Sequence, residues 1–232
     1  MFSLAVFWPF SRGITRIGTV LKLALIGMSG SGKTFWANKL AGCGYRLISC
    51  DDRIEQKLAA ELSAAGYLGI GGVAAWMGWP DSAAYRDREQ KYLQCEIEVI
   101  REILGELARA REEKIVVDTT GSVIYTGKKF CQELRQQTTV VYLEASPQEQ
   151  ATLIERYLRD PKPVLWREEF QQRKEETPRE TVGRCYPQLI EYRRTLYEEL
   201  AHRVVPISDL RGAHLGGNDF LRILEKQAHH AR

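Results

Sequence analysis

Short apolar runs alternate along the chain with longer segments in which apolar residues recur at helical spacing. The runs, each long enough for one buried strand, lie at 23–26, 45–48, 115–117, 140–143 and 204–207. The segments that we expect to be helical lie at 35–40, 53–65, 82–111, 126–136, 147–158 and 187–202. This alternation favours an α/β fold, in which a mostly parallel sheet is covered by helices on both faces.

Two further segments follow neither pattern. Residues 66–78 are rich in glycine and apolar residues, and we expect them to form a mobile cap. Residues 158–181 are densely charged, which suits a mobile segment more than a core helix.

The first apolar run leads directly into a phosphate-binding sequence. Residues 27–34 read GMSGSGKT, which matches the P-loop pattern G-x-x-x-x-G-K-[ST]. Glycines let backbone N–H groups surround phosphate oxygens at the N-terminus of the following helix. Lys33 is expected to reach the β- and γ-phosphates, and Thr34 to bind Mg²⁺. The sequence therefore predicts a site for ATP and Mg²⁺. Its loop residues are Gly27, Ser29, Gly30, Ser31, Gly32, Lys33 and Thr34.

Composition limits the other functions that the chain could have. Its 232 residues carry a formal net charge of +3, which is too small to argue for nucleic acid. The five cysteines are widely spaced without a C-x-x-C pair, which argues against disulfides and zinc and fits a reducing compartment. No apolar run approaches the roughly 20 residues that span a bilayer. We therefore expect a cytoplasmic monomer without a nucleic-acid or membrane partner.

The N-terminal part of the chain is basic. No Asp or Glu precedes Asp51, a pattern that suits either an anionic ligand or a basic solvated face. Within residues 1–20 the charges of Arg12 and Arg16 follow the apolar stretch, which argues against a secretory signal. We expect residues 1–20 to be a poorly ordered extension, with an organelle-targeting segment as the minor alternative. Residues 21–232 are then expected to form a single domain.

Acidic residues follow the second and third predicted strands. Asp51 and Asp52 come shortly after residues 45–48, and Asp118 directly follows residues 115–117. Ligands of parallel sheets bind at the carboxyl ends of strands, where phosphoryl transfer needs a metal-holding acid and a base or orienting group. Asp118 is the better candidate for Mg²⁺, and a turn-starting aspartate is the alternative. One of Asp51 and Asp52 is expected to cap the following helix.

Several segments are similar to the shikimate kinase family of P-loop small-molecule kinases, over roughly residues 22–205. LISCDDRIE (47–55) resembles the family's acceptor-side segment with Asp-x-Asp, and YRDRE (85–89) resembles its Phe-Arg-x-x-Glu. KPVL (162–165) resembles the Arg-Pro-Leu-Leu of its ATP lid. YRRTLYEELA (192–201) resembles its closing Arg-x-x-x-Tyr-x-x-x-Ala helix. The order and approximate spacing agree throughout.

The resemblance implies a P-loop kinase fold with five parallel strands, the P-loop strand in the middle and a mobile lid near 159–181. It implies transfer of the γ-phosphoryl group of ATP to a hydroxyl of a small acid, shikimate, in aromatic amino acid biosynthesis. Lys33, Asp51 and Lys162 would be catalytic, with Asp51 at the acceptor hydroxyl. The acceptor would contact Asp51, Gly121, Arg86 and Arg193, whose guanidinium groups suit a carboxylate. Either arginine could instead be a solvated helix residue.

The sequence departs from the family pattern at three places. Ser49 stands at the first aspartate, Thr120-Gly121-Ser122 stands at a Gly-Gly-Gly segment, and Lys162 replaces the lid arginine. These changes bear on the acceptor more than on the donor. One alternative is therefore a kinase of the same architecture acting on gluconate, another sugar acid or a nucleotide. Another is a nucleotide-binding protein that has lost transfer.

Overall fold

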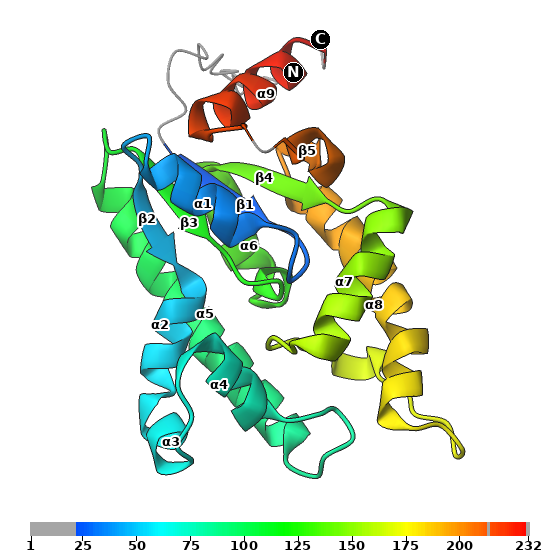
Figure 1. The fold of residues 1–232 in the computed structure, drawn as a ribbon. Helices are drawn as coiled ribbons and strands as arrows, with labels where there is room; N and C mark the ends of the chain where they lie inside the picture. Colours follow the sequence, from blue (N-terminus) through cyan, green and yellow to red (C-terminus); the bar gives the residue numbers. More distant parts are fainter. Residues whose placement is uncertain (1–21, 213, 231–232) are drawn as a thin grey trace, which may run out of the picture.

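The computed structural model describes residues 22–212 and 214–230, so the extension predicted for residues 1–20 lies outside it. The described residues form a five-stranded sheet with the order β2-β3-β1-β4-β5. The strands are β1 (Lys22–Ile26), β2 (Arg46–Ser49), β3 (Ile115–Asp118), β4 (Thr139–Glu144) and β5 (Arg203–Pro206). Every neighbouring pair is parallel, and the P-loop strand β1 is central (Figure 1). The predicted α/β fold is confirmed.

Helices cover both faces of this sheet. They are α1 (Lys33–Ala41), α2 (Cys50–Lys57), α3 (Ala59–Ala64), α4 (Gly69–Met77), α5 (Tyr85–Arg109), α6 (Lys128–Gln137), α7 (Pro147–Arg159), α8 (Pro178–Leu200) and α9 (Gly217–His230). Three short 3-10 helices are η1 (Val123–Tyr125), η2 (Arg167–Glu169) and η3 (Ile207–Leu210). None of the helices in this part of the chain is long and apolar enough to cross a membrane.

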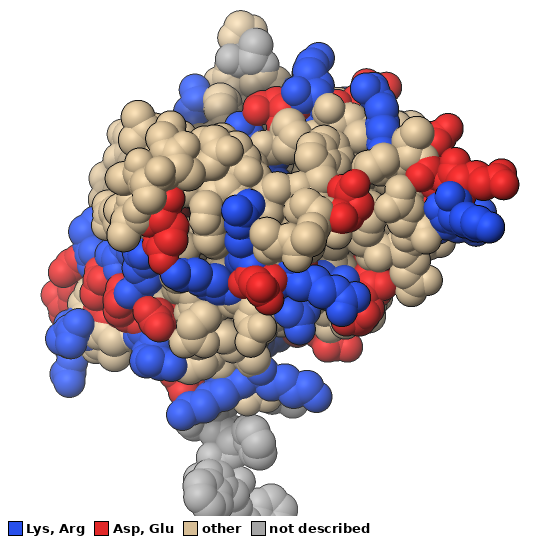
Figure 2. Space-filling model, turned by 90° about the horizontal axis from the view of Figure 1, so that it is seen from below, with Lys and Arg blue, Asp and Glu red and all other residues tan. Residues whose placement is uncertain are grey.

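Each central strand is buried on both of its faces. Leu23 and Leu25 pack with residues of α1 and α9, where Phe220 stacks on Trp36 with ring centroids 5.1 Å apart. The alternate residues of β1 pack with residues of α5, α6 and α8 on the other face. Burial of both faces explains why the strands appear as continuous apolar runs instead of alternating patterns. On the outer surface seen in Figure 2, acidic and basic side chains are interspersed.

Helix α8 begins earlier than the sequence pattern predicted. It starts at Pro178, and Pro187 lies inside it instead of at its beginning. Thr177 and Glu180 form a capping box, with Pro178 at the first helical position. Both are standard helix-start signals, and the charge density of this segment masked them. Helix α9 was not predicted at all.

The two segments expected to be mobile are in fact partly packed into the core. Residues 69–77 form α4, and Val73 and Trp76 are buried. At the base of the predicted lid, Leu165 and Trp166 are fully buried. The Tyr85 hydroxyl donates to the Val164 carbonyl (2.7 Å) and accepts from the Trp166 N–H (3.1 Å). Residues 69–77 and 164–166 are therefore packed against the core, whereas the mobility of these segments stays a prediction.

The end of β2 is capped by Ser49. Its Oγ accepts a hydrogen bond from the Asp52 N–H (3.2 Å), so Ser49 is the N-cap of α2. The prediction that Asp51 or Asp52 caps this helix is wrong, because both lie in its first turn. Carboxylates in a first turn are stabilised by the helix dipole. The serine at the family's aspartate position therefore has a structural role, since it fixes the turn that carries Asp51.

Replacing Ser49 tests this role in the stability of the fold. Ser49→Ala should lower the free energy of unfolding by about 1 kcal/mol, because the Asp52 N–H loses its acceptor, whereas Ser49→Asp should keep the cap. Urea denaturation measures the change. Ser63→Ala, at an exposed position of α3, is the matched control and should stay within about 0.5 kcal/mol of the wild type. Equal losses in the two alanine variants would contradict the assignment of the cap.

Candidate active site

The P-loop, the start of α2 and the start of the predicted lid meet at one cavity of about 290 Å³. Three residues predicted to be catalytic, Lys33, Asp51 and Lys162, all line it. The other lining residues are Ser29, Gly30, Gly32, Thr34, Phe35, Ile70, Tyr92, Thr120, Gly121 and Pro163. The fold therefore brings together groups that are more than a hundred residues apart in the sequence.

The P-loop adopts a conformation that depends on its glycines. Gly27 has φ of 140° and Gly32, directly before α1, has φ of 96°, both of which favour glycine. A Cβ on Gly27 would lie 2.8 Å from the Leu143 carbonyl oxygen of β4, too close for any side chain. The Ser31 hydroxyl in this loop is buried without a hydrogen-bond partner among the described residues. A buried polar atom of this kind fits a loop that receives an anion.

Lys33 is the charged centre of the loop. Its Nζ donates to the carbonyl oxygens of Gly27 (2.9 Å) and Met28 (3.0 Å), and the residue is 7% exposed. Burial lowers the pKa of the Lys33 ammonium, and the carboxylates of Asp118 and Asp51 act in the opposite direction. The two carboxylates therefore help to keep a buried lysine charged.

Asp118 reaches this region from the end of β3. The strand register pairs it with Leu25 of β1 and with Ser49 of β2. Burial raises the pKa of Asp118, while Lys33 and a hydrogen bond with Thr34 lower it. Its Oδ1 is buried and has no hydrogen-bond partner within the described part of the chain. Thr34 and Asp118, the two predicted metal-binding residues, therefore lie together.

Asp51 faces the cavity from the first turn of α2. Burial raises the pKa of Asp51 to about 6, against the lowering effect of Lys33. The Tyr92 hydroxyl of α5 donates to its Oδ1 at 3.4 Å. Tyr92 was not predicted as a site residue, since an aromatic residue on a long helix usually indicates core packing.

A second carboxyl group near the cavity was also missed by the sequence analysis. Glu96 of α5 is 0% exposed and accepts hydrogen bonds from the hydroxyls of Thr120 and Ser122. Burial raises the pKa of Glu96 to about 7, although both hydroxyls lower it. The two residues that replace family glycines are therefore hydrogen-bonded to a buried acid.

The structure does not bring Arg86 together with Asp51. Arg86 is exposed and lines a separate cavity of about 520 Å³ with Glu89 and Arg167. Arg88, half a turn further along α5, lies on the helix face of Tyr92, one turn away. Its Nη1 donates to the Trp76 carbonyl at 2.5 Å.

Arg193 is close to the site but already has partners in the protein. It is 1% exposed, and its guanidinium donates to the carbonyls of Gly121 (3.0 Å) and Leu165 (2.6 Å). Its Nε donates to the Tyr125 hydroxyl at 3.2 Å. Arg193 thus joins the loop after β3 to the base of the lid. In this arrangement its guanidinium donors are used within the protein and cannot form a bidentate contact with an acceptor.

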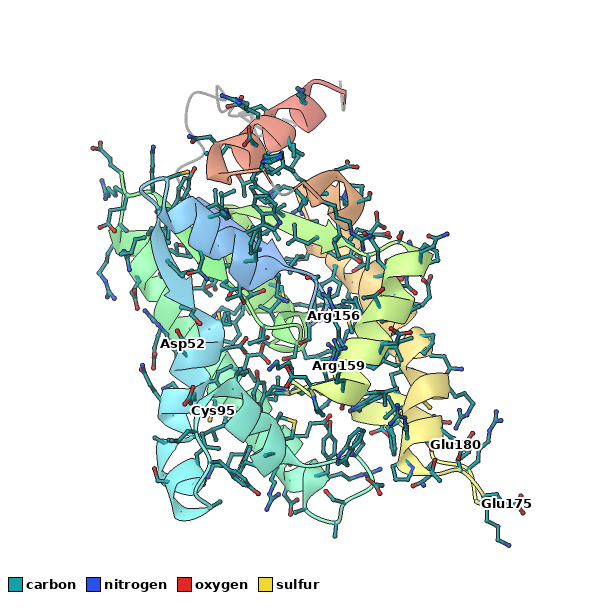
Figure 3. The ribbon with its side chains drawn as sticks, viewed as in Figure 1. Asp52, Cys95, Arg156, Arg159, Glu175 and Glu180 are labelled. Atoms are coloured by element: carbon teal, nitrogen blue, oxygen red, sulfur yellow. The ribbon has the colours of Figure 1, made fainter. Side chains whose placement is uncertain are left out.

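An arginine of α7 contacts the P-loop. Arg156 Nη1 donates to the Gly30 carbonyl at 3.4 Å, and Figure 3 labels Arg159 nearer to the C-terminal end of the same helix. The sequence analysis did not single them out, because arginines in the last turns of a helix are common. Arg156 adds positive charge at the loop where phosphates would bind.

Comparison with known proteins gives both a sequence relative and structural neighbours. A shikimate kinase from Paracidovorax citrulli is 32% identical over 134 residues, which are 57% of this chain and 60% of that protein. The chain therefore matches less than two thirds of this relative.

Solved structures of shikimate kinases have the same fold. The enzyme from Acinetobacter baumannii, in complex with shikimate, has a TM-score of 0.58 at 22% identity, covering 92% of this chain and 96% of the other. The enzyme from Bacteroides thetaiotaomicron has a TM-score of 0.57 at 16% identity, covering 90% and 98%. The resemblance found in the sequence is thus confirmed. A family model described as an AAA domain also matches residues 23–184. On this match the chain belongs to the AAA-domain family of P-loop proteins.

Proposed function

We propose that this protein is an ATP-dependent kinase that phosphorylates a hydroxyl of a small anionic acceptor, with shikimate as the first candidate. One observation carries the proposal: P-loop Lys33, acceptor-side Asp51 and lid Lys162 line the same cavity. A donor site and an orienting carboxylate in one cavity are the requirements of phosphoryl transfer. The relative and the structural neighbours, which are shikimate kinases, support the choice of acceptor.

Phosphate binding is assigned to the loop and the lid. Backbone N–H groups of residues 29–34 would surround the phosphates, and Lys33 would exchange the carbonyls of Gly27 and Met28 for phosphate oxygens. Lys162 would approach from the lid side of the cavity. In this structure Lys162 is partly exposed and paired with Asp160 at 2.9 Å, so it would exchange that carboxylate for phosphate. Two cations near the transferred group would then stabilise the charge that develops on its oxygens in the transition state.

Orientation of the acceptor is assigned to Asp51. With a pKa of about 6, its carboxyl group is mostly ionised at neutral pH and can accept a hydrogen bond from the acceptor hydroxyl. The Tyr92 hydroxyl, which lines the same cavity, donates to this carboxylate. In a loose transition state, alignment of the hydroxyl with the γ-phosphorus contributes more than strong base catalysis.

Thr34 and Asp118 would hold Mg²⁺. The Asp118 carboxylate is hydrogen-bonded to Thr34, and its buried Oδ1 has no hydrogen-bond partner among the described residues, which fits this ion. The described part of the chain contains no group of three or more His, Cys, Asp or Glu residues that could hold a metal ion. Mg²⁺ is commonly held by one or two carboxylates, waters and phosphates, without a protein cage. When bound, it would neutralise charge on the phosphate oxygens.

The biological setting belongs to the same proposal. We place the protein in the cytoplasm as a monomeric single-domain enzyme of aromatic amino acid biosynthesis. Its five cysteines are free, which fits a reducing compartment. The sequence resemblance and the named relative support the pathway.

An acceptor screen tests the function. Purified protein with Mg²⁺-ATP should release ADP slowly alone and at least about tenfold faster with shikimate, because the acceptor completes the site. Gluconate and nucleoside monophosphates are added in parallel. Turnover with one of these and none with shikimate would keep the mechanism and remove shikimate as the acceptor. Nucleotide binding without turnover for any acceptor would favour a binding protein that has lost transfer.

The position of the acceptor's carboxylate is tested by comparing two arginines of α5. We propose Arg88, on the Tyr92 face of α5, in place of exposed Arg86 as the residue that binds the acceptor's carboxylate. Arg88→Lys should then raise the acceptor KM by at least about tenfold, because an ammonium cannot form a bidentate contact. Arg86→Lys is the matched control on the exposed face and should stay within about twofold of the wild type. Steady-state kinetics with varied acceptor measures both. A larger rise in the acceptor KM for Arg86→Lys than for Arg88→Lys would show that Arg86 binds the acceptor's carboxylate, as the family resemblance implies.

A further inference from the structure

A carboxyl group that the proposed function does not use lies fully buried beside the cavity. Glu96 accepts hydrogen bonds from Thr120 Oγ1 and from Ser122 Oγ, the latter at 2.7 Å. The two hydroxyls are 3.1 Å apart, and the Ser122 N–H also donates to Thr120 Oγ1 at 3.1 Å. A buried carboxylate is costly unless it is hydrogen-bonded, so this cluster ties three side chains into one arrangement.

The loop that these hydroxyls belong to forms part of the cavity wall. Thr120 and Gly121 both line the cavity. A Cβ on Gly121 would lie 3.3 Å from the Ser29 nitrogen, so the loop packs closely against the P-loop. From α8, Arg193 Nη1 (3.0 Å) and the Tyr197 hydroxyl (2.5 Å) donate to the Gly121 carbonyl. The loop is therefore held from α8 through its backbone and from α5 through Glu96.

The same face of α5 also contacts the acceptor side of the cavity. Tyr92, one helical turn before Glu96, donates to Asp51 Oδ1. A shift of the α5 face that carries Tyr92 and Glu96 would therefore move residues 120–122 and the hydrogen-bond donor of Asp51 together. Glu96 forms no hydrogen bond with Asp51 or the P-loop in the described structure. Its charge acts on Asp51 and Arg193 through space, whereas its direct contacts are the hydrogen bonds with Thr120 and Ser122.

We propose that Glu96 is a positioning residue for the acceptor: it binds the hydroxyls of Thr120 and Ser122 and thereby fixes residues 120–122 where the acceptor contacts them. The inference rests on the proposed function for the identity of the acceptor. Hydroxyl side chains at two family glycine positions are thus accommodated by a buried acid that accepts both of them. The loop keeps its close approach to the P-loop at Gly121.

A set of matched variants tests this role through kinetics. At pH 8, above its pKa of about 7, Glu96 is ionised, and Glu96→Gln keeps the shape but weakens two charge-assisted hydrogen bonds. This variant should raise the acceptor KM about tenfold at that pH, while the ATP KM stays within about twofold. Glu96→Ala should raise the acceptor KM further than Glu96→Gln does. In a Thr120→Val/Ser122→Ala background, Glu96→Gln should add less than about twofold, because its partners are gone. Glu98→Gln, on the same helix with a half-exposed side chain paired to Lys57, is the control and should match the wild type.

Three kinetic results would overturn the proposal. They are an unchanged acceptor KM in Glu96→Gln, an equal rise in the ATP KM, and effects that simply add in the combined variant. If Glu96→Gln shows no cooperative thermal transition, Ser122→Ala replaces it. This variant removes one hydrogen bond and should raise the acceptor KM about threefold, and no change would count against the proposal.

Amide hydrogen exchange separates this inference from the proposed function. If the wild type gives no turnover with any acceptor, the proposed function fails, whereas loop positioning is still measurable. Exchange in peptides covering residues 119–125 should be at least about tenfold faster in Glu96→Gln than in Glu98→Gln, because the loop has lost its anchor. Equal exchange in the two variants would overturn the positioning role whatever the substrate.

Discussion

The buried ammonium of Lys33 determines where the other polar groups of the cavity must lie. Burial disfavours its charge, and the carboxylates of Asp118 and Asp51 offset that effect. A buried charge without partners would cost several kcal/mol. The two acids come from the end of β3 and the first turn after β2, so the sheet order β2-β3-β1 is what brings them to the P-loop. A sheet that separated β2 and β3 from β1 would leave the lysine without these two partners.

Most of the fold could be predicted because its strands are short, apolar and buried on both faces. The P-loop pattern also predicted that one strand is followed by one helix. Glycine is needed at position 27 because a Cβ there would lie too close to the Leu143 carbonyl oxygen of β4. The start of α8 was missed because dense charge outweighed the capping signal at Thr177. Helix α9 was missed although its 14 residues have apolar positions at helical spacing and an aspartate in the first turn, and although Phe220 packs on Trp36.

The site could be predicted only where a residue's role follows from its position beside a strand or loop. Lys33, Asp51 and Lys162 share the cavity, but the helical residues were harder to assign. In α5 the polar residues recur on several faces, so the sequence alone could not separate exposed Arg86 from Arg88, or find Glu96 in the core. Arg193 is buried and donates to two backbone carbonyls and to the Tyr125 hydroxyl, and these tertiary contacts leave no trace in the local sequence pattern.

The central claim is that Asp118 binds Mg²⁺ whereas Asp51 orients the acceptor hydroxyl. A Mg²⁺ titration of turnover tests this claim most directly. Asp118→Asn should raise the Mg²⁺ concentration for half-maximal turnover by at least about tenfold, because the metal loses its charged ligand. Asp51→Asn should leave that concentration within about twofold and lower kcat by about a hundredfold or more, because the acceptor hydroxyl loses its orienting carboxylate. The reverse pattern, with the Mg²⁺ requirement moved by Asp51→Asn alone, would contradict it.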